Sequence, residues 1–311
     1  MQAASNLPQP TLQGALATLP LATPFLLSVT QAASEMPGVK PVSLPQTMDA
    51  IGAQFANWRE TNINLLEPLL GLAPDQSLPC VMAAVLASAP SPMPFHNHHH
   101  TREVVMLAMM LSQKLPLQAR VELFVAACIH DFVHDGMGNM RGGKHTPMRL
   151  ERKSLDAALP YLVAAGLSEE IFRRVMAMVL STDVSKPDKN SISPAEWMRK
   201  AYAGESGAGC PEPLQPLFAD KSLAHQAALL EDSDLGTSAG LPYKFAQRMT
   251  ALIAEETRVL APTPQTLIGF IDHICHGAFI TPEAKALFGE NMQTLRAEAE
   301  AEATDTIYKW S

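Results

Sequence analysis

The chain has 311 residues, of which 47% are hydrophobic, so it can bury the core of one large domain or of two small ones. Its formal net charge of −8, without a basic cluster, argues against a surface that binds nucleic acid. The four cysteines (Cys80, Cys128, Cys210 and Cys275) contain no CxxC pair, which excludes a zinc ribbon or a disulfide framework and favours reduced thiols in a cytoplasmic protein.

Residues 1–46 are rich in Ala, Leu, Pro, Thr and Ser, and we expect an arm with little regular structure. Residues 13–34 are apolar, but no Lys or Arg precedes Lys40, and Pro20 and Pro24 interrupt the run. We therefore expect neither a signal peptide nor a membrane span. From Thr47 onward, apolar residues recur at three- and four-residue intervals, which predicts a helix.

The middle of the chain reads as a series of helices. Their expected ranges are Leu78–Leu86, Thr101–Gln113, Gln118–Val133, Pro147–Ala165 and Ser168–Leu180. Ser168 is the expected N-cap of the last of these, with two glutamates in its first turn.

Residues 185–222 are rich in Pro, Gly, Ser and Lys, which predicts a flexible loop or a lid. The remainder is helical again, over Ala224–Leu230, Tyr243–Glu255, Pro264–His276 and Pro282–Ala303. Because no alternating strand pattern of useful length is present, the sequence predicts an all-α, compact multi-helix bundle forming one domain over residues 47–311.

Metal-ligand side chains are concentrated in this middle region. The pair His130-Asp131 follows an apolar helix, and His134 comes one turn later. Imidazoles and carboxylates from several helices are what a site for divalent cations needs. A surface histidine cluster is the alternative explanation for His96 and His100, which are four residues apart in HNHHH.

Carboxylates also occur at the expected ends of apolar helices. An isolated buried carboxylate costs several kcal/mol unless it is paired or binds metal, which favours Asp131 and Asp234 as ligands. Asp232 is better explained as a helix cap. Glu151 and Asp183 could be solvated charges, Thr182 a cap, and Phe270 a core aromatic residue.

Five motifs resemble a known family when they are taken in order: FHNHHHT, IHDFVHDGMGN, MVLSTDVSKP, SDLG and GFIDHICH. Together they are similar to the catalytic domain of the class I cyclic-nucleotide phosphodiesterases, within the HD-domain metal-dependent phosphohydrolases. The resemblance covers roughly residues 50–280 and implies the all-α HD-domain fold.

The resemblance also implies two divalent metal ions. His100, His130, Asp131 and Asp234 would hold one, usually zinc, and Asp131 would bridge to a second, usually magnesium or manganese. His134, Glu151 and Thr182 match positions that order the waters of the second metal.

The same resemblance implies how the reaction proceeds. A hydroxide that bridges the metals would attack phosphorus, and His96 matches the general acid that protonates the leaving oxygen. Glu151 is one candidate for the carboxylate that orients His96. Asn139 matches a polar position beside the pocket, and Phe270 matches the phenylalanine that packs on a purine ring.

The sequence departs from the family where the base would bind. Leu267 stands at the position of the glutamine that reads the purine edge. Phe95 replaces a tyrosine, Val133 an aspartate and Thr237 an asparagine. The expected ligand set is complete, whereas the family's base-reading glutamine is absent, which leaves base recognition to another group or to none.

Three functions follow from these observations. The first is hydrolysis of a 3′,5′-cyclic nucleotide such as cAMP or cGMP, and the second is hydrolysis of another phosphoester or nucleotide, which Leu267 favours. The third is a catalytically silent helical domain that binds a ligand. The first two predict a small-molecule partner and neither nucleic acid nor membrane; the oligomeric state is left open.

Overall fold

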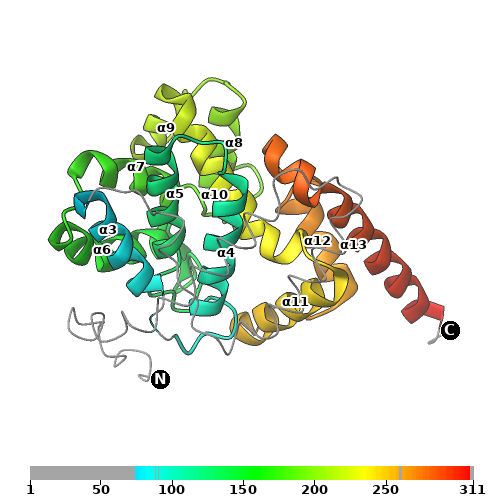
Figure 1. The fold of residues 1–311 in the computed structure, drawn as a ribbon. Coiled ribbons are helices and arrows are strands. Elements are labelled where there is room, and N and C mark those ends of the chain that lie inside the picture. The colour runs from blue at the N-terminus through cyan, green and yellow to red at the C-terminus, as the bar shows by residue number, and fades with distance from the viewer. Residues whose placement is uncertain (1–73, 88, 90, 259–260, 309–311) are drawn as a thin grey trace.

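The computed structural model describes residues 74–308 except 88, 90, 259 and 260 (Figure 1). The elements in chain order are α3 (Pro74–Ala87), α4 (His98–Leu111), α5 (Leu117–Ile129), β1 (Met140–Arg141), β2 (Lys144–His145), α6 (Arg149–Ala164), α7 (Glu169–Leu180), α8 (Pro194–Tyr202), the 3₁₀ helix η3 (Glu212–Leu214), α9 (Gln215–Ala219), α10 (Lys221–Ala239), α11 (Tyr243–Thr257), α12 (Pro264–His273) and α13 (Pro282–Tyr308).

The all-α class is confirmed. Among the described residues, the only strands are β1 and β2, which pair antiparallel through Met140 with His145 and Arg141 with Lys144. The expected arm over residues 1–46 and the helix expected from Thr47 lie outside the described residues.

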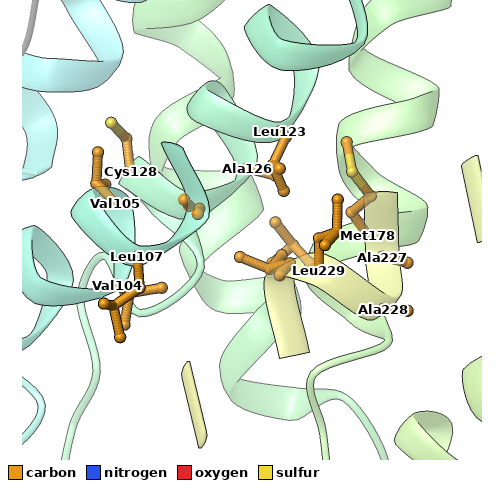
Figure 2. Packing of buried hydrophobic residues seen from close by; sticks show 14 of the residues in the cluster. Val104, Val105, Leu107, Leu123, Ala126, Cys128, Met178, Ala227, Ala228 and Leu229 are labelled. Atoms are coloured by element: carbon orange, nitrogen blue, oxygen red, sulfur yellow. The ribbon is translucent and has the colours of Figure 1, made fainter. Parts of the chain in front are cut away.

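Helix α10 occupies the centre of the bundle. It packs against α4, α5, α7, α8 and α13, and Ala227, Ala228 and Leu229 are fully buried in it. Figure 2 shows these residues near Leu123 and Ala126 of α5 and Met178 of α7. Because α10 is apolar on several sides, it can be surrounded by helices instead of covering one face of the core.

Helices α4 and α5 bring chemistry-bearing residues to this central helix. Asn97 is the N-cap of α4, and its side chain accepts hydrogen bonds from the backbone N–H groups of His99 (2.8 Å) and His100 (3.4 Å). The N-cap therefore starts α4 within the HNHHH run, before the expected start at Thr101, and fixes His100 in the first helical turn.

Helix α5 ends earlier than the sequence predicts, at Ile129 instead of Val133. Val133 has a φ of 91°, a left-handed backbone that a β-branched residue rarely adopts and that no α-helix can contain. Gly136 and Gly138 also have positive φ values. The helix therefore ends directly before the pair His130-Asp131, and the turn that follows brings His134 against His96, which precedes α4.

The segment 185–222 differs from the expected flexible loop. It contains α8, η3 and α9. Helix α8 starts with a capping box, in which the hydroxyl of Ser193 accepts from the backbone N–H of Glu196 and the carboxylate of Glu196 accepts from the N–H of Ser193. Pro194 at the first helical position is compatible with this start, so a composition typical of loops forms a helix.

Helices α11, α12 and α13 form the other side of the molecule, and the C-terminal part of α13 extends away from the bundle (Figure 1). The start of α13 is attached to α10 through Asp232. Its carboxylate accepts hydrogen bonds from the backbone N–H groups of Ile280 and Thr281 and from the Thr281 hydroxyl, each at 2.7 Å. Asp232 is thus a structural residue, as expected, although the helix it anchors is α13.

None of the helices in the described part of the chain combines the length and the apolar character that crossing a membrane requires.

Candidate metal centre

The four predicted metal ligands lie close together between α4, α5 and α10. His100 Nε2 lies 3.0 Å from Asp234 Oδ1 and 3.4 Å from Asp131 Oδ2. His130 Nε2 lies 3.1 Å from Asp131 Oδ2 and 4.0 Å from Asp234 Oδ1. Both imidazoles are buried, with side chains 2% and 1% exposed. This cluster of His100, His130, Asp131 and Asp234 is called the ligand cluster below.

Each candidate ligand has its position set by the element that carries it. His100 belongs to the first turn of α4, and His130 directly follows α5. Asp234 lies inside α10, not at its end, because that helix continues to Ala239. Since the three helices pack on one another, the cluster lies where they meet.

The Nε2 atoms of His100 and His130 are placed so that they could bind a cation. His130 Nδ1 lies 2.9 Å from the carbonyl oxygen of Ala127, so Nδ1–H donates to that oxygen and the neutral ring has a lone pair on Nε2. Nε2 of His130 and Nε2 of His100 are buried, and carboxylate oxygens of Asp131 and Asp234 lie within 3.0–3.1 Å of them. Lone pairs that face carboxylate oxygens at close range fit a divalent cation placed between them.

The pKa values of His100 and Asp131 also show that this cluster attracts positive charge. Burial lowers the pKa of His100, but the carboxylates of Asp131 and Asp234 raise it by more, to about 10. Burial raises the pKa of Asp131, and the imidazoles of His130, His96 and His100 together bring it well below its usual range. The carboxylates therefore attract positive charge to this point, and a metal ion would compete with protons for the imidazoles.

A second group of ionisable residues consists of His96, His134 and Glu256, which offer ligand atoms within 4.8 Å of one another. His96 Nδ1 lies 2.5 Å from Glu256 Oε1, and the other oxygen of Glu256 accepts the backbone N–H groups of Phe95 (2.9 Å) and His96 (3.0 Å). The rings of His96 and His134 stack with their centroids 3.8 Å apart.

This arrangement corrects one expectation from the sequence. The carboxylate that holds His96 is Glu256 of α11, whereas Glu151 accepts hydrogen bonds from Asn139 Nδ2 at 3.2 and 3.4 Å. Sequence reasoning missed Glu256 because it lies 160 positions from His96 and belongs to an ordinary Glu255-Glu256 pair at the end of a helix. No local signal distinguishes it from a solvated charge.

The charges of the second group are set by burial and by each other. Burial raises the pKa of Glu256, but the hydrogen bond and charge of His96 outweigh this effect and lower the pKa to about 2. Burial and then the charge of His96 lower the pKa of His134 to about 4. Glu256 is therefore an anion, and His134 is a neutral ring whose Nδ1 accepts the Gly136 N–H at 3.1 Å.

The remaining polar residues form a third group at the start of α6. Asn139 joins the carboxylate of Glu151 to the backbone, since its Oδ1 accepts the N–H of Leu150 at 2.9 Å. Asp183 accepts the N–H of Met148 at 2.7 Å. Burial, and next the charge of Asp183, raises the pKa of Glu151 to about 8, with Asp131 adding a further repulsion. Thr182 donates to the carbonyl of Val179 at 2.9 Å.

Leu267 and Phe270 lie on α12, which packs against α11 and α13. Leu267 is 2% exposed and belongs to the hydrophobic core. Phe270 is half-buried and packs against that core. The side chain of Leu267 has no polar atom with which to recognise a ligand.

Comparison with known proteins identifies the fold. No protein-family model and no curated protein matches the sequence. Among solved structures, two of the phosphodiesterase domain of the rhodopsin phosphodiesterase of the choanoflagellate Salpingoeca rosetta match at 16% identity, with TM-scores of 0.56 and 0.58. They cover 88% and 89% of this chain and 94% and 96% of theirs.

A third solved structure, LmjPDEB1 in complex with IBMX, matches at 15% identity with a TM-score of 0.55, over 88% of this chain and 97% of that chain. The similarity therefore extends over almost the whole of each matched domain and agrees with the all-α architecture described above. The chain has the fold of the phosphodiesterase catalytic domain.

Proposed function

We propose that the chain is a metal-dependent phosphohydrolase that converts a 3′,5′-cyclic nucleotide such as cAMP or cGMP to the 5′-monophosphate. The observation that carries this proposal is the ligand cluster, whose buried imidazole lone pairs converge on two carboxylates. The phosphodiesterase fold and the nearby pair of His96 and Glu256 support it.

His100, His130, Asp131 and Asp234 would hold the first metal ion, for which we propose zinc because imidazole and carboxylate are its common ligands. Asp131 would extend to a second ion, magnesium or manganese, beside His134, Glu151 and Thr182. Two such ions supply Lewis-acid stabilisation of the phosphoryl oxygens and lower the pKa of water.

The protein's own contribution is the proton for the leaving ribose oxygen. Because Nδ1–H of His96 donates to the Glu256 carboxylate, its other nitrogen, Nε2, is free to carry the proton toward a substrate. Glu256 balances the positive charge of the ring and fixes its plane, while the stacked ring of His134 limits rotation. Proton donation of this kind contributes about 10²–10⁴-fold in rate.

Incubation of the metal-loaded protein with cAMP and with cGMP tests the substrate. We expect turnover that is lost in His96→Ala because the donor is gone, and lost in Asp131→Ala because a ligand is gone. Metal analysis of the same samples separates the two effects, since only Asp131→Ala should lose metal from the ligand cluster. Absence of turnover of both nucleotides would contradict the proposed substrate.

A second candidate is another phosphoester or a different nucleotide, and the burial of Leu267 favours it. A side chain without polar atoms cannot make the paired hydrogen bonds that distinguish purines, so the half-buried Phe270 would offer only stacking. A screen of diverse phosphoesters distinguishes the candidates, and a strong preference for cyclic purine nucleotides would rule out this one.

A cytoplasmic location is part of the same proposal. All four cysteines are buried and free. Burial raises the pKa of Cys80 to about 12, so that thiol is protonated and unreactive at neutral pH. Free thiols are typical of a reducing compartment, which supports this location.

A further inference from the structure

We propose that His96, His134 and Glu256 form a separate zinc site, and that a zinc ion bound there inhibits the enzyme by removing its proton donor. The inhibitory part rests on the function proposed above; the existence of the site does not. The three side chains offer two imidazole nitrogens and one carboxylate oxygen within 4.8 Å of one another. Two histidines and one glutamate are a common protein donor set for zinc.

The distances favour a zinc ion in the place of a proton. His134 Nδ1 lies 3.5 Å from Glu256 Oε1. Two ligands of a tetrahedral zinc, each about 2.0–2.2 Å from the ion, lie roughly 3.3–3.5 Å apart. The contact of 2.5 Å between His96 Nδ1 and the same oxygen is that of a shared proton. A bound zinc ion would increase the distance between His96 Nδ1 and Glu256 Oε1, and the proton between them would be released to water.

The surroundings permit this rearrangement. His96 precedes α4 and its side chain is 25% exposed, so its ring has room to turn once the hydrogen bond to Glu256 that holds it is broken, whereas Glu256 is only 2% exposed and stays in place. The rings of His96 and His134 stack at an angle of 22°, so both must tilt to direct their lone pairs to one ion. For His134, zinc replaces a single hydrogen bond from the Gly136 N–H.

The rearrangement has a direct consequence for the proposed reaction. Once Nδ1 of His96 binds zinc, the ring no longer donates to Glu256 and turns away from the position in which Nε2 faces a substrate. Magnesium prefers oxygen ligands and binds imidazole weakly. Excess zinc should therefore inhibit the enzyme at concentrations at which excess magnesium does not.

Zinc counting on the full chain tests the site itself. The protein is dialysed against increasing free zinc in the presence of excess magnesium, and bound zinc per chain is measured by mass spectrometry. We compare wild type with Glu256→Gln, His134→Asn and Glu255→Gln. Glu255 is exposed, neighbours Glu256 on α11 and serves as the matched control.

Wild type and Glu255→Gln should bind one zinc more than Glu256→Gln and His134→Asn, or bind it at least roughly tenfold more tightly. The side-chain amide oxygen that Glu256→Gln introduces can still accept the backbone N–H groups of Phe95 and His96, so the fold is retained, and thermal unfolding of each variant checks this. If all four proteins bind the same amount of zinc with the same affinity, the proposed zinc site does not exist.

Hydrolysis rates measured over the same zinc series test the inhibition. In wild type and Glu255→Gln, the rate should fall with the midpoint at which the extra zinc binds. A rate unchanged by the extra zinc would overturn the inhibitory role. If no phosphoester is hydrolysed at any zinc concentration, the proposed function fails, and the zinc count still decides whether the site exists.

Discussion

At the scale of single residues, the pair of His96 and Glu256 is the feature on which the proposed chemistry most depends. We predict that Glu256→Gln lowers kcat by about 10²-fold or more, because a neutral amide cannot balance the charge of His96. Steady-state kinetics with metal analysis measures this, and the metal content of the ligand cluster should stay the same. Glu255→Gln is the control, and equal kcat values for the two variants would contradict the role of Glu256.

Glu151 gives a prediction for the effect of pH on the metal-free protein. Its pKa is raised from 4.5 to about 8 by burial and by Asp183, so the folded state retains a proton that the unfolded chain loses. The stability that this proton supplies is complete below about pH 4.5 and is lost as the pH rises through about 8.

Wild type should therefore lose stability between pH 5 and pH 8, and Glu151→Gln should lose roughly 2–4 kcal/mol less over the same range. Urea unfolding of both metal-free proteins at the two pH values measures the difference. Other groups, such as His100, titrate in both proteins, so the comparison isolates Glu151. Equal losses in the two proteins would show that residue 151 carries no raised pKa.

The sequence singled out the four residues that the structure brings together in the ligand cluster, whereas it missed Glu256; that the four bind metal stays a prediction. His130 and Asp131 are adjacent in a motif, and His100 and Asp234 belong to motifs of their own, so the resemblance of these motifs to a known family could identify them. Glu256 belongs to no motif, and only the packing of α11 beside the start of α4 shows its partner. A carboxylate that acts through a distant contact is not visible in a single sequence.

At the scale of elements, the junction between α10 and α13 depends on Asp232. Replacing it with Ala leaves the buried N–H and hydroxyl of Thr281 without their acceptor and should destabilise the fold by about 2–4 kcal/mol. Asp232→Asn keeps one acceptor oxygen and should cost less. Urea denaturation measures both, and equal stability of Asp232→Ala and wild type would contradict the anchoring role.

The start of α7 was predicted correctly, because a capping side chain next to the helix determines it. Ser168 caps α7 as expected, since its hydroxyl accepts the N–H of Ile171. The end of α5 was predicted four residues too late. The apolar pattern continues through Phe132 and Val133, but the backbone of Val133 has a positive φ and is not helical. The capping box of Ser193 and Glu196 starts α8 within a segment whose Pro, Gly, Ser and Lys content is typical of loops, so composition alone does not predict this helix.

At the scale of the whole molecule, a bound metal ion should stabilise the fold, because the ligand cluster joins α4, α5 and α10. We predict that chelation lowers Tm and that zinc restores it. At a free zinc concentration of 100 times Kd, the stabilisation is about 2.7 kcal/mol. Thermal unfolding with and without chelator measures this, with Asp131→Ala as the control that should respond weakly; an equal response of both proteins would contradict the assignment.

The all-α class and the bundle were predictable from periodicity alone, whereas substrate choice was not. Leu267 is part of the core, so the group that recognises a base must come from elsewhere on the molecule or be missing. Such recognition depends on which side chains meet around α12, and a linear pattern does not contain that information.

The most direct test of the central claim is the initial rate of cAMP and cGMP hydrolysis by one protein sample before metal removal, after it, and after zinc and magnesium are restored. We predict that the rate disappears on metal removal and returns on reloading, and that Asp131→Ala shows no recovery. Hydrolysis that persists without metal, or a fully loaded protein that hydrolyses neither nucleotide, would contradict the claim.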